Sequence, residues 1–541
     1  MPESTSGQAG PTLTTAAEIA AEVLARTPGD LQAQARHESF VGMGGSSMDA
    51  VRLLSLCERR LGMTIDLARL LSQAPLAEVL AEVTGCEEPP GAEERAAGRL
   101  ARDRELLPGQ REMLLAEKYG GAGSALRQLG SAELSGPLDV AALKQTLSWI
   151  VARHEALRTV FVQTGKIDFA RRVLPACEPR LISQRLRVAP GDNGVDAVHE
   201  RVGDIAEQML PPLGLPPVVF VLTELGERHH LLSVLIHHLI ADAWAAGLLW
   251  REIFEHYRAL AAGAEPPVMP PAPSPDLIAR RRAALDASGR LAELTEARIA
   301  QLKGVPAVID LPTVLPRAPG IDFRAGRLPF TLTRAARDAC DDLAGRAKVT
   351  RTMVMLAAWA LVVARRAGMS ECVIGGVALQ RPTAELMRTV ASCAAPVPIR
   401  CAFPDDQPAG DYLRAIAGAS GDAVAAADVP LDSLIAGLGV AAADRRLPLV
   451  QVMFSAYDGY IPLTMQAGDL HVRFHESYCG GTSVDVALFL QGWDDAPGLI
   501  MEYAVSVLTA GEAARLAGSL NDTLCELAHR LDSPLSQVSV T

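Results

Sequence analysis

The sequence lacks several features that would assign the chain to common classes of protein. Its nine cysteines in 541 residues show no regular pairing, which is typical of reduced thiols in a cytoplasmic protein and not of a disulfide framework. Basic residues are outnumbered: 51 Lys and Arg stand against 63 Asp and Glu, a net charge of −12. We therefore expect no surface for nucleic acid.

An export signal and a long apolar run are also missing. Residues 1–7 have neither a basic start nor an apolar core, so they do not form a secretory signal. The most apolar segment, residues 353–364, is too short to span a bilayer and is flanked by arginines. We expect a core helix there, no association with a membrane, and a cytoplasmic protein.

Two proline-bearing stretches divide what is present. Residues 84–95 (TGCEEPPGAEER) are polar and charged, as in a linker between domains, and residues 265–275 are rich in proline. The two halves that flank the second stretch each mix helical patterns with apolar strands, which indicates α+β or α/β lobes. With 49% hydrophobic residues, the chain can bury several cores.

The most informative segment, residues 237–244 (HHLIADAW), follows the apolar run 231–236. Such a run predicts a strand buried on both faces, whose alternation sends His237 and His238 to opposite sides. Neutral imidazole is a suitable general base, and a tight turn would bring Asp242 back to fix the loop. The alternative is a buried strand end with two hydrogen-bonded histidines.

A metal site is a third interpretation of the same segment, because His229 and His230 precede the strand. Those two histidines lie at the opposite end of the strand from His237 and His238. No cysteine or carboxylate completes a set of ligands at a familiar spacing. We therefore predict no metal.

A second segment, residues 153–161 (RHEALRTVF), follows the amphipathic stretch 140–147. Together the two segments resemble the condensation domains of nonribosomal peptide synthetases, in which RHExLRTxF precedes HHxxxDG at this separation. Ala243 replaces the glycine after the aspartate, so either the backbone there is ordinary or the added methyl group narrows the channel. Weaker counterparts of other family segments are found at residues 107–114, 390–398, 428–431 and 446–449.

Near the start, residues 40–48 (FVGMGGSSM) precede apolar residues at helical spacing. Ser46 or Ser47 could simply cap a helix. The segment also resembles the peptidyl carrier domains of the same synthetases, whose GGxSL serine carries 4′-phosphopantetheine. Alignment on the two glycines makes Ser47 the attachment site. The resemblance therefore implies a peptidyl carrier protein–condensation didomain.

The fold class that the resemblance implies is multidomain. A disordered N-terminus (1–12) precedes a small all-α, four-helix carrier domain (13–84) and a linker (85–105). A two-lobed α/β (α+β) condensation domain of chloramphenicol-acetyltransferase-like fold follows, with its N-lobe at 106–275 and its C-lobe at 276–541. The active site is expected where the two lobes meet.

The activity that the resemblance implies is amide formation between a thioester donor on Ser47 and an amine acceptor. His238 would act as the general base or hold the amine and the intermediate, and His237 would pack behind it. Asp242 would be architectural and paired with an arginine such as Arg158. Loss of His238 would leave residual activity, since holding two substrates together supplies part of the rate.

The implied partners follow from the order of domains. A phosphopantetheinyl transferase would modify Ser47. No adenylation domain is visible before the carrier, so a separate one would load it in trans. The acceptor would be a downstream carrier protein or a free amine. The alternatives are an ester-forming or product-releasing condensation-like enzyme and a catalytically silent recruitment scaffold.

Overall fold

The computed structural model describes sixteen segments of the chain. They are residues 10–24, 26–40, 43, 53, 56–57, 60–61, 63–65, 70, 74–81, 84–85, 104–187, 194–315, 322–440, 447–456, 460–492 and 498–540. Ser46 and Ser47 lie outside these segments.

The described part of the first domain is mainly helical. It contains α1 (Gly10–Val23), α2 (Pro28–Gln34) and α5 (Leu76–Ala81). Two strands of two residues each, β1 (Met63–Thr64) and β2 (Thr84–Gly85), pair antiparallel and add a short ladder to the predicted all-helical domain. The boundary predicted at residue 13 falls inside α1, because the helix already begins at Gly10.

The N-lobe is built on a six-stranded sheet of order β13-β14-β3-β8-β7-β6, in which β6 and β7 are parallel and the other neighbours antiparallel. Its strands are β3 (Arg127–Ser135), β6 (Leu181–Arg185), β7 (Val218–Gly226), β8 (His229–His237), β13 (Thr464–Ala467) and β14 (Leu470–Tyr478). The predicted strand at 231–236 is confirmed as the middle of β8.

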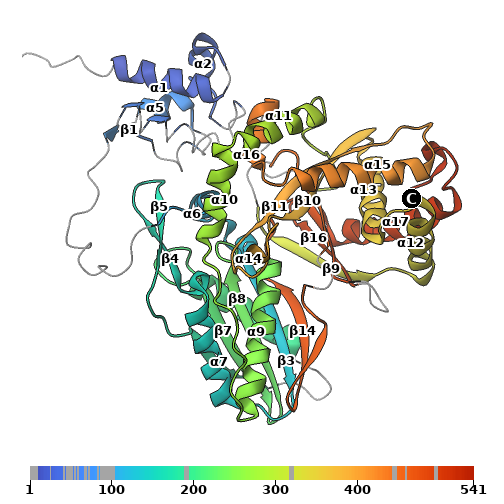
Figure 1. The fold of residues 1–541 in the computed structure, drawn as a ribbon. Coiled ribbons are helices and arrows are strands. Elements are labelled where there is room, and N and C mark those ends of the chain that lie inside the picture. Colours follow the sequence, from blue (N-terminus) through green and yellow to red (C-terminus); the bar gives the residue numbers. More distant parts are fainter. Residues whose placement is uncertain are drawn as a thin grey trace, which may run out of the picture.

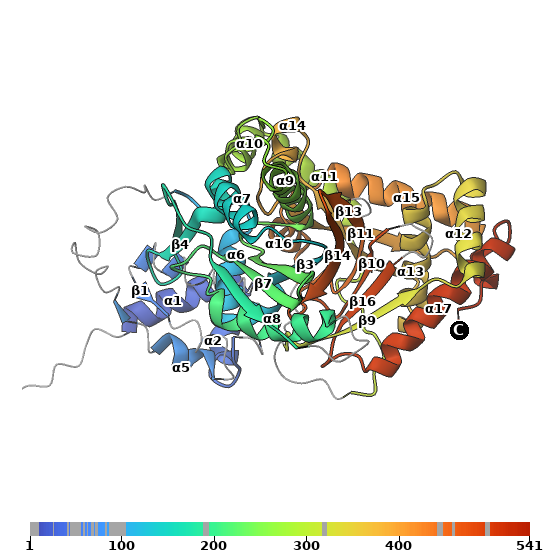
Figure 2. The same cartoon turned by 90° about the horizontal axis from the view of Figure 1, so that it is seen from below.

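Helices cover both faces of this sheet, as Figure 2 shows. Successive side chains of β8 point to opposite faces of the sheet. Leu231 and Leu235 pack with α8 (Val195–Met209) on one face, whereas Leu232 and Ile236 belong to the larger core on the other. That core includes buried residues of α7 (Val140–Arg153) and α9 (Ala243–Ala261). The apolar run of β8 is therefore the result of burial on both faces.

One strand pair corrects the predicted division of the lobes at residue 275. Strands β13 and β14 come from the C-terminal half of the sequence, yet β14 pairs with β3 along residues 471–478 and extends the N-lobe sheet. In Figure 1 the orange β14 lies beside the blue β3. An open edge of β3 would leave unpaired backbone groups, and the later segment satisfies them.

The C-lobe has its own six-stranded sheet, of order β11-β10-β12-β15-β16-β9. Strands β10, β12 and β15 run parallel, and the outer pairs are antiparallel. The strands are β9 (Ala325–Thr331), β10 (Glu371–Leu379), β11 (Ala394–Ala402), β12 (Val452–Ala456), β15 (Val486–Leu490) and β16 (Gly498–Ala504). Its longer helices are α12 (Arg334–Ala347), α13 (Arg351–Ala367), α15 (Ala409–Ala425) and α17 (Ala510–His529).

The predicted core helix at 353–364 is confirmed as part of α13. Residues 354–364 of this helix are all buried, and Trp359 also donates Nε1–H to the Met453 carbonyl at 3.1 Å. No single helix in the described segments is long and apolar enough to cross a membrane; α12 and α13 meet that test only together, as a pair bent by 108°.

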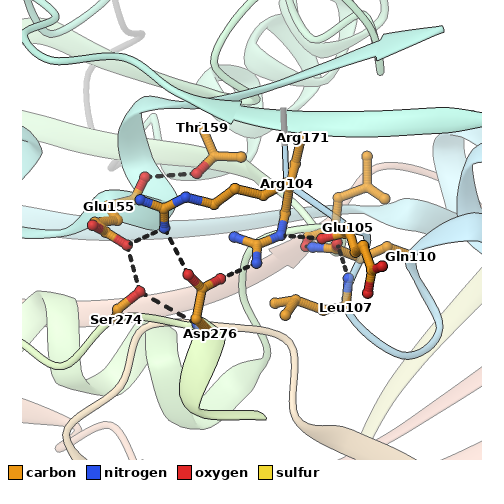
Figure 3. Close-up of polar contacts among 10 residues, drawn as sticks. Arg104, Glu105, Leu107, Gln110, Glu155, Thr159, Arg171, Ser274 and Asp276 are labelled. Atoms are coloured by element: carbon orange, nitrogen blue, oxygen red, sulfur yellow. Dashed lines mark hydrogen bonds and ion pairs between the residues drawn. The ribbon is translucent and has the colours of Figure 1, made fainter. Parts of the chain in front are cut away.

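Helix α10 (Asp276–Ala287) links the two lobes along the outside of the molecule. At its start, Asp276 accepts hydrogen bonds from Arg171 and, at 2.9 Å, from Arg104 (Figure 3). One turn later, Arg281 binds both carboxylate oxygens of Asp428 in the C-lobe. The backbone of Arg104 also pairs with Arg171, so the end of the predicted linker (85–105) already belongs to the condensation fold.

Candidate functional site

The segment after β8 forms the candidate active site. Strand β8 ends at His237, and Asp242 is the N-cap of α9, accepting a hydrogen bond from the Ala245 amide at 2.9 Å. Ala243 is the first residue of α9 and has no positive φ. Of the two predictions for Ala243, the ordinary backbone is therefore the one confirmed, because a helix start needs no glycine.

His237 lies fully buried behind this segment. Its Nδ1 accepts a hydrogen bond from the Leu239 amide at 3.0 Å, which leaves Nε2 to donate to Glu117 at 2.6 Å. Glu117 comes from α6 (Gln110–Gly120) and also accepts from Arg127 at 2.9 Å. Both ring nitrogens are thus engaged, which supports the packing and hydrogen-bonding role predicted for His237.

His238 points the other way and is half-buried. Its backbone amide donates to the Leu126 carbonyl at 2.8 Å, and its Nε2 lies 2.9 Å from Nε2 of Gln128 on β3. The alternation along β8 therefore separates the two imidazoles as predicted, and His238 is the one with an accessible surface.

The surroundings of His238 keep its imidazole uncharged. The pKa of His238 is lowered from 6.5 to about 4, chiefly by burial and also by the neighbouring His237. Asp242 and the backbone of Ala241 act in the opposite direction but do not balance the burial. A neutral ring with an available lone pair is the form that accepts a proton or a hydrogen bond.

We expect the His238 ring to stay neutral until the pH falls to about 4, whereas an ordinary histidine is protonated near pH 6.5. Between these values the unfolded chain binds a proton that the folded chain does not. The stability that this residue contributes is therefore complete above pH 6.5 and is lost as the pH falls toward 4. An NMR titration of the histidine rings, with His238→Ala to identify the signal, measures the midpoint; a midpoint near 6.5 would contradict this electrostatic account.

Asp242 is held mainly by the C-lobe. Its carboxylate binds Nη2 of Arg381 at 2.9 and 3.0 Å, and both side chains are within 1% of complete burial. The same carboxylate accepts the backbone amides of Cys393 and Ala394 at 2.8 and 3.0 Å. Residues 390–398, which match the family only weakly in sequence, thus reach the site through their backbone.

The pairing predicted between Asp242 and Arg158 is wrong. Arg158 ends the 3₁₀ helix η2 (Glu155–Arg158), and its Nη1 donates to the carbonyl of Leu174, whose amide in turn binds the Arg158 carbonyl at 2.9 Å. The hairpin of β4 (Thr159–Gln163) and β5 (Phe169–Val173) brings these two residues together. Arg158 therefore supports this hairpin and not the loop of His238.

The recognised segment 153–161 holds the N-lobe together instead of contacting His238. His154 Nε2 and Arg153 Nε each lie 2.8 Å from the Glu252 carboxylate on α9. Glu155 turns away to Arg104, at 3.1 Å, and to the hydroxyl of Ser274, at 2.6 Å (Figure 3). Arg153 and His154 thus fix α9, which begins beside the candidate active site.

Four residues that contact the site were not singled out from the sequence. Gln110 lies within the weakly matching opening segment; its Nε2 donates to the Leu239 carbonyl at 2.8 Å, so this segment was a usable signal. Glu117 follows seven residues later on the same helix face. Gln128 and Arg381 belong to no recognised segment, and only their contacts reveal them.

The other two predicted features concern metal and the carrier serine. No group of three or more metal-ligating side chains occurs among the described residues. His229 instead binds Glu133, at 2.9 Å. Ser47 lies outside the described residues, so its assignment remains a prediction from the sequence.

Comparison with known families agrees with this architecture. Residues 101–541 match the family described as "Condensation domain", and residues 15–83 match "Phosphopantetheine attachment site". The chain belongs to the condensation domain family. It carries a phosphopantetheine carrier domain in front of the condensation domain, in the arrangement found in nonribosomal peptide synthetases.

This carrier–condensation didomain spans only a small part of the synthetases that it matches. Malpibaldin synthetase of Mortierella alpina is 26% identical over 97% of this chain, which covers 9% of that synthetase. Among solved structures, the X-domain from teicoplanin biosynthesis (TM-score 0.70, 22% identity) covers 81% of this chain and matches over 97% of its own. The first condensation domain of the calcium-dependent antibiotic synthetase (TM-score 0.69, 19% identity) covers 81% of this chain and matches over 99% of its own. These structures establish the two-lobed α/β fold.

Proposed function

We propose that this didomain forms an amide bond between an acyl group held as a thioester on Ser47 and an amine acceptor supplied by another molecule. The observation that carries the proposal is His238: a neutral, half-buried imidazole beside the buried Asp242–Arg381 pair that joins the two lobes. The carrier's phosphopantetheine supplies the thiol that holds the donor group.

The contacts around His238 support a site that is fixed before substrates arrive. Its loop is held by Gln110 from α6, by Asp242 at the start of α9, and through Asp242 by Arg381 of the C-lobe. Trp244 adds a further contact between the lobes, since its Nε1–H donates to the Met387 carbonyl at 2.8 Å. Orientation of this kind contributes to rate because the reacting groups need no further ordering.

The proposed reaction is a nucleophilic substitution at the thioester carbon. The amine nitrogen forms a bond to that carbon, a tetrahedral intermediate results, and the carbon–sulfur bond then breaks. The products are an amide and a thiol, which takes the proton that the nitrogen loses. His238 would accept a hydrogen bond, and then that proton, at its Nε2.

The lowered pKa of His238 favours one order of events. An imidazole with a pKa of about 4 is too weak a base to deprotonate a free ammonium efficiently. The nitrogen of the tetrahedral intermediate is more acidic, because it is bonded to the former carbonyl carbon. We therefore assign His238 to holding the amine during attack and taking its proton afterwards.

The first test of the proposal is loading of the carrier. Incubation with coenzyme A and a broad-specificity phosphopantetheinyl transferase should add one phosphopantetheine to the intact protein and to Ser46→Ala. It should add none to Ser47→Ala, since only the serine aligned with the family site can react. Intact-mass spectrometry measures this; loss of modification in Ser46→Ala instead would move the site to the neighbouring serine.

The second step tests the reaction itself. The same transferase, supplied with aminoacyl-coenzyme A analogues, would attach acyl-phosphopantetheine to Ser47, with the acyl group held as a thioester on the arm, and a panel of amines and alcohols would then be added. Release of an amide product with return of the free thiol on the carrier would support the proposal. Release of an ester would favour the ester-forming alternative, and an acyl group that stays on the carrier with every acceptor would favour a recruitment scaffold.

A further inference from the structure

Gln128 contacts the nitrogen to which the proposed function assigns the chemistry. Its Nε2 lies 2.9 Å from Nε2 of His238. Gln128 sits on β3 opposite Ile236 of β8 and opposite Tyr478 of β14, so its backbone is held by a strand on each side. A side chain on so fixed a backbone defines where the imidazole can lie.

The contact between the Gln128 amide and the ring indicates the tautomer of His238. The amide nitrogen of Gln128 can only donate, so Nε2 of His238 accepts its hydrogen bond and the proton of the neutral ring lies on Nδ1. In the neutral ring the proton on Nδ1 leaves a lone pair on Nε2. Gln128 must then present its NH₂ group, and its Oε1 is buried without a hydrogen-bond partner among the described residues.

A protonated ring reverses this requirement. Both nitrogens of an imidazolium are donors, so Nε2–H needs an acceptor. Rotation of the Gln128 amide about its last torsion, which has two nearly equivalent orientations, replaces NH₂ by Oε1 at the same place. The amide can therefore bond Nε2 in either state without movement of the backbone.

We propose that Gln128 is the positioning residue for His238: its amide donates to Nε2 while the ring is neutral, gives way to the amine, and accepts from Nε2–H once the ring has taken the proton. The proton comes from the attacking nitrogen and leaves with the released thiol. His238 is thus held in one orientation before and after proton uptake. Gln128 supplies this support from the N-lobe sheet.

The ionisable groups around the ring are already engaged with one another. His237 and Asp242 act directly on His238. Glu117 from α6 and Arg127 from β3 are bonded to the His237 side, and Arg381 from the C-lobe is bonded to Asp242. Among the described residues the side-chain hydrogen bond to Nε2 of His238 comes from neutral Gln128.

Replacement of Gln128 by glutamate gives the sharpest test, because a carboxylate of the same shape can accept but cannot donate. We expect Gln128→Glu to raise the pKa of His238 by about one unit or more. The measurement is a pH titration of the ring nitrogens by NMR in the full chain labelled with ¹⁵N-histidine. His238→Ala identifies the signal, and Gln184→Glu, on β6 of the same sheet, is the matched control.

Gln128→Leu removes both donor and acceptor and tests the kinetic role. We expect kcat for amide formation to fall about tenfold, as for the loss of one hydrogen bond, with KM for the acceptor within about twofold, since the amide does not bind the acceptor in the ground state. A variant that only loosened the fold would alter KM and the melting temperature together. Wild-type kcat in Gln128→Leu would overturn the proposal, as would an unchanged titration of His238 in Gln128→Glu.

Because the role of Gln128 rests on the function proposed above, the two measurements separate the possible failures. The ring titration needs no substrate. A shifted titration in Gln128→Glu, with no amide formed by the unaltered protein, would support Gln128 as the partner of His238 and reject the proposed reaction. Amide formation by the unaltered protein, with an unchanged ring titration in Gln128→Glu and an unchanged kcat in Gln128→Leu, would support the proposed reaction and reject the role of Gln128.

Discussion

His238→Ala is expected to lower kcat for amide formation by about 100-fold or more, within the range attributed to positioned acid–base groups. The variant loses the acceptor at Nε2 but keeps the hydrogen bonds of Gln110 and Asp242 that shape the loop. Loading of the carrier should be unchanged. The measurement is the single-turnover rate of acyl transfer from the charged carrier to a fixed amine, followed by intact mass.

The matched control is His230→Ala, at the other end of the same strand. It should transfer the acyl group at the wild-type rate. His238→Ala should also keep a slow residual rate, because orientation of two bound substrates by itself accelerates reaction. Equal rates in His238→Ala and the unaltered protein would remove His238 from the chemistry and favour a scaffold.

Asp242→Ala is expected to lower the free energy of unfolding of the condensation domain by about 3–5 kcal/mol, as for other buried ion pairs broken from one side. The substitution leaves the guanidinium of Arg381 buried without its carboxylate and removes the acceptor for the amides of Cys393 and Ala394. These contacts connect the lobes, so their loss should loosen the junction. Urea unfolding followed by tryptophan fluorescence measures the change.

Two further variants show whether the effect belongs to the pair. Glu293→Ala breaks an exposed ion pair with Arg290 and should cost less than about 1 kcal/mol. Asp242→Ala combined with Arg381→Leu should be less unstable than the sum of the single variants, because the second change removes the unpaired charge. If the losses in the free energy of unfolding of the two single variants simply add in the double variant, Asp242 and Arg381 act separately.

The structure also separates motif recognition from chemical role. The segment of Arg153, His154 and Glu155 identified the family as clearly as that of His238. Arg153 and His154 nevertheless bind Glu252 of α9, and Glu155 binds Arg104 and Ser274, so these side chains act by packing and not in the chemistry. The motif identifies the family, but the residues that its side chains bind lie in other parts of the sequence. The role of each side chain therefore becomes visible only in the structure.

Local patterns determined much of this protein from the sequence alone. The apolar run before His237 predicted β8, and the alternation of side chains along it predicted that His237 and His238 point apart. The core helix predicted from the apolar run at 353–364 is part of the buried α13. These features depend on residues close together in the chain, so the sequence displays them directly.

Only the tertiary structure decided the contacts between distant segments. Asp242 is neutralised by Arg381, 139 positions later in the sequence, and not by Arg158. Gln128 contacts His238, which lies 110 positions further along the chain. Strand β14 pairs with β3 of the N-lobe sheet although it follows the first part of the C-lobe in the sequence. Any arginine can pair with a buried carboxylate, and any sheet edge can accept a strand. Which one does so depends on the packing of the two lobes, and that arrangement is a property of the folded chain as a whole.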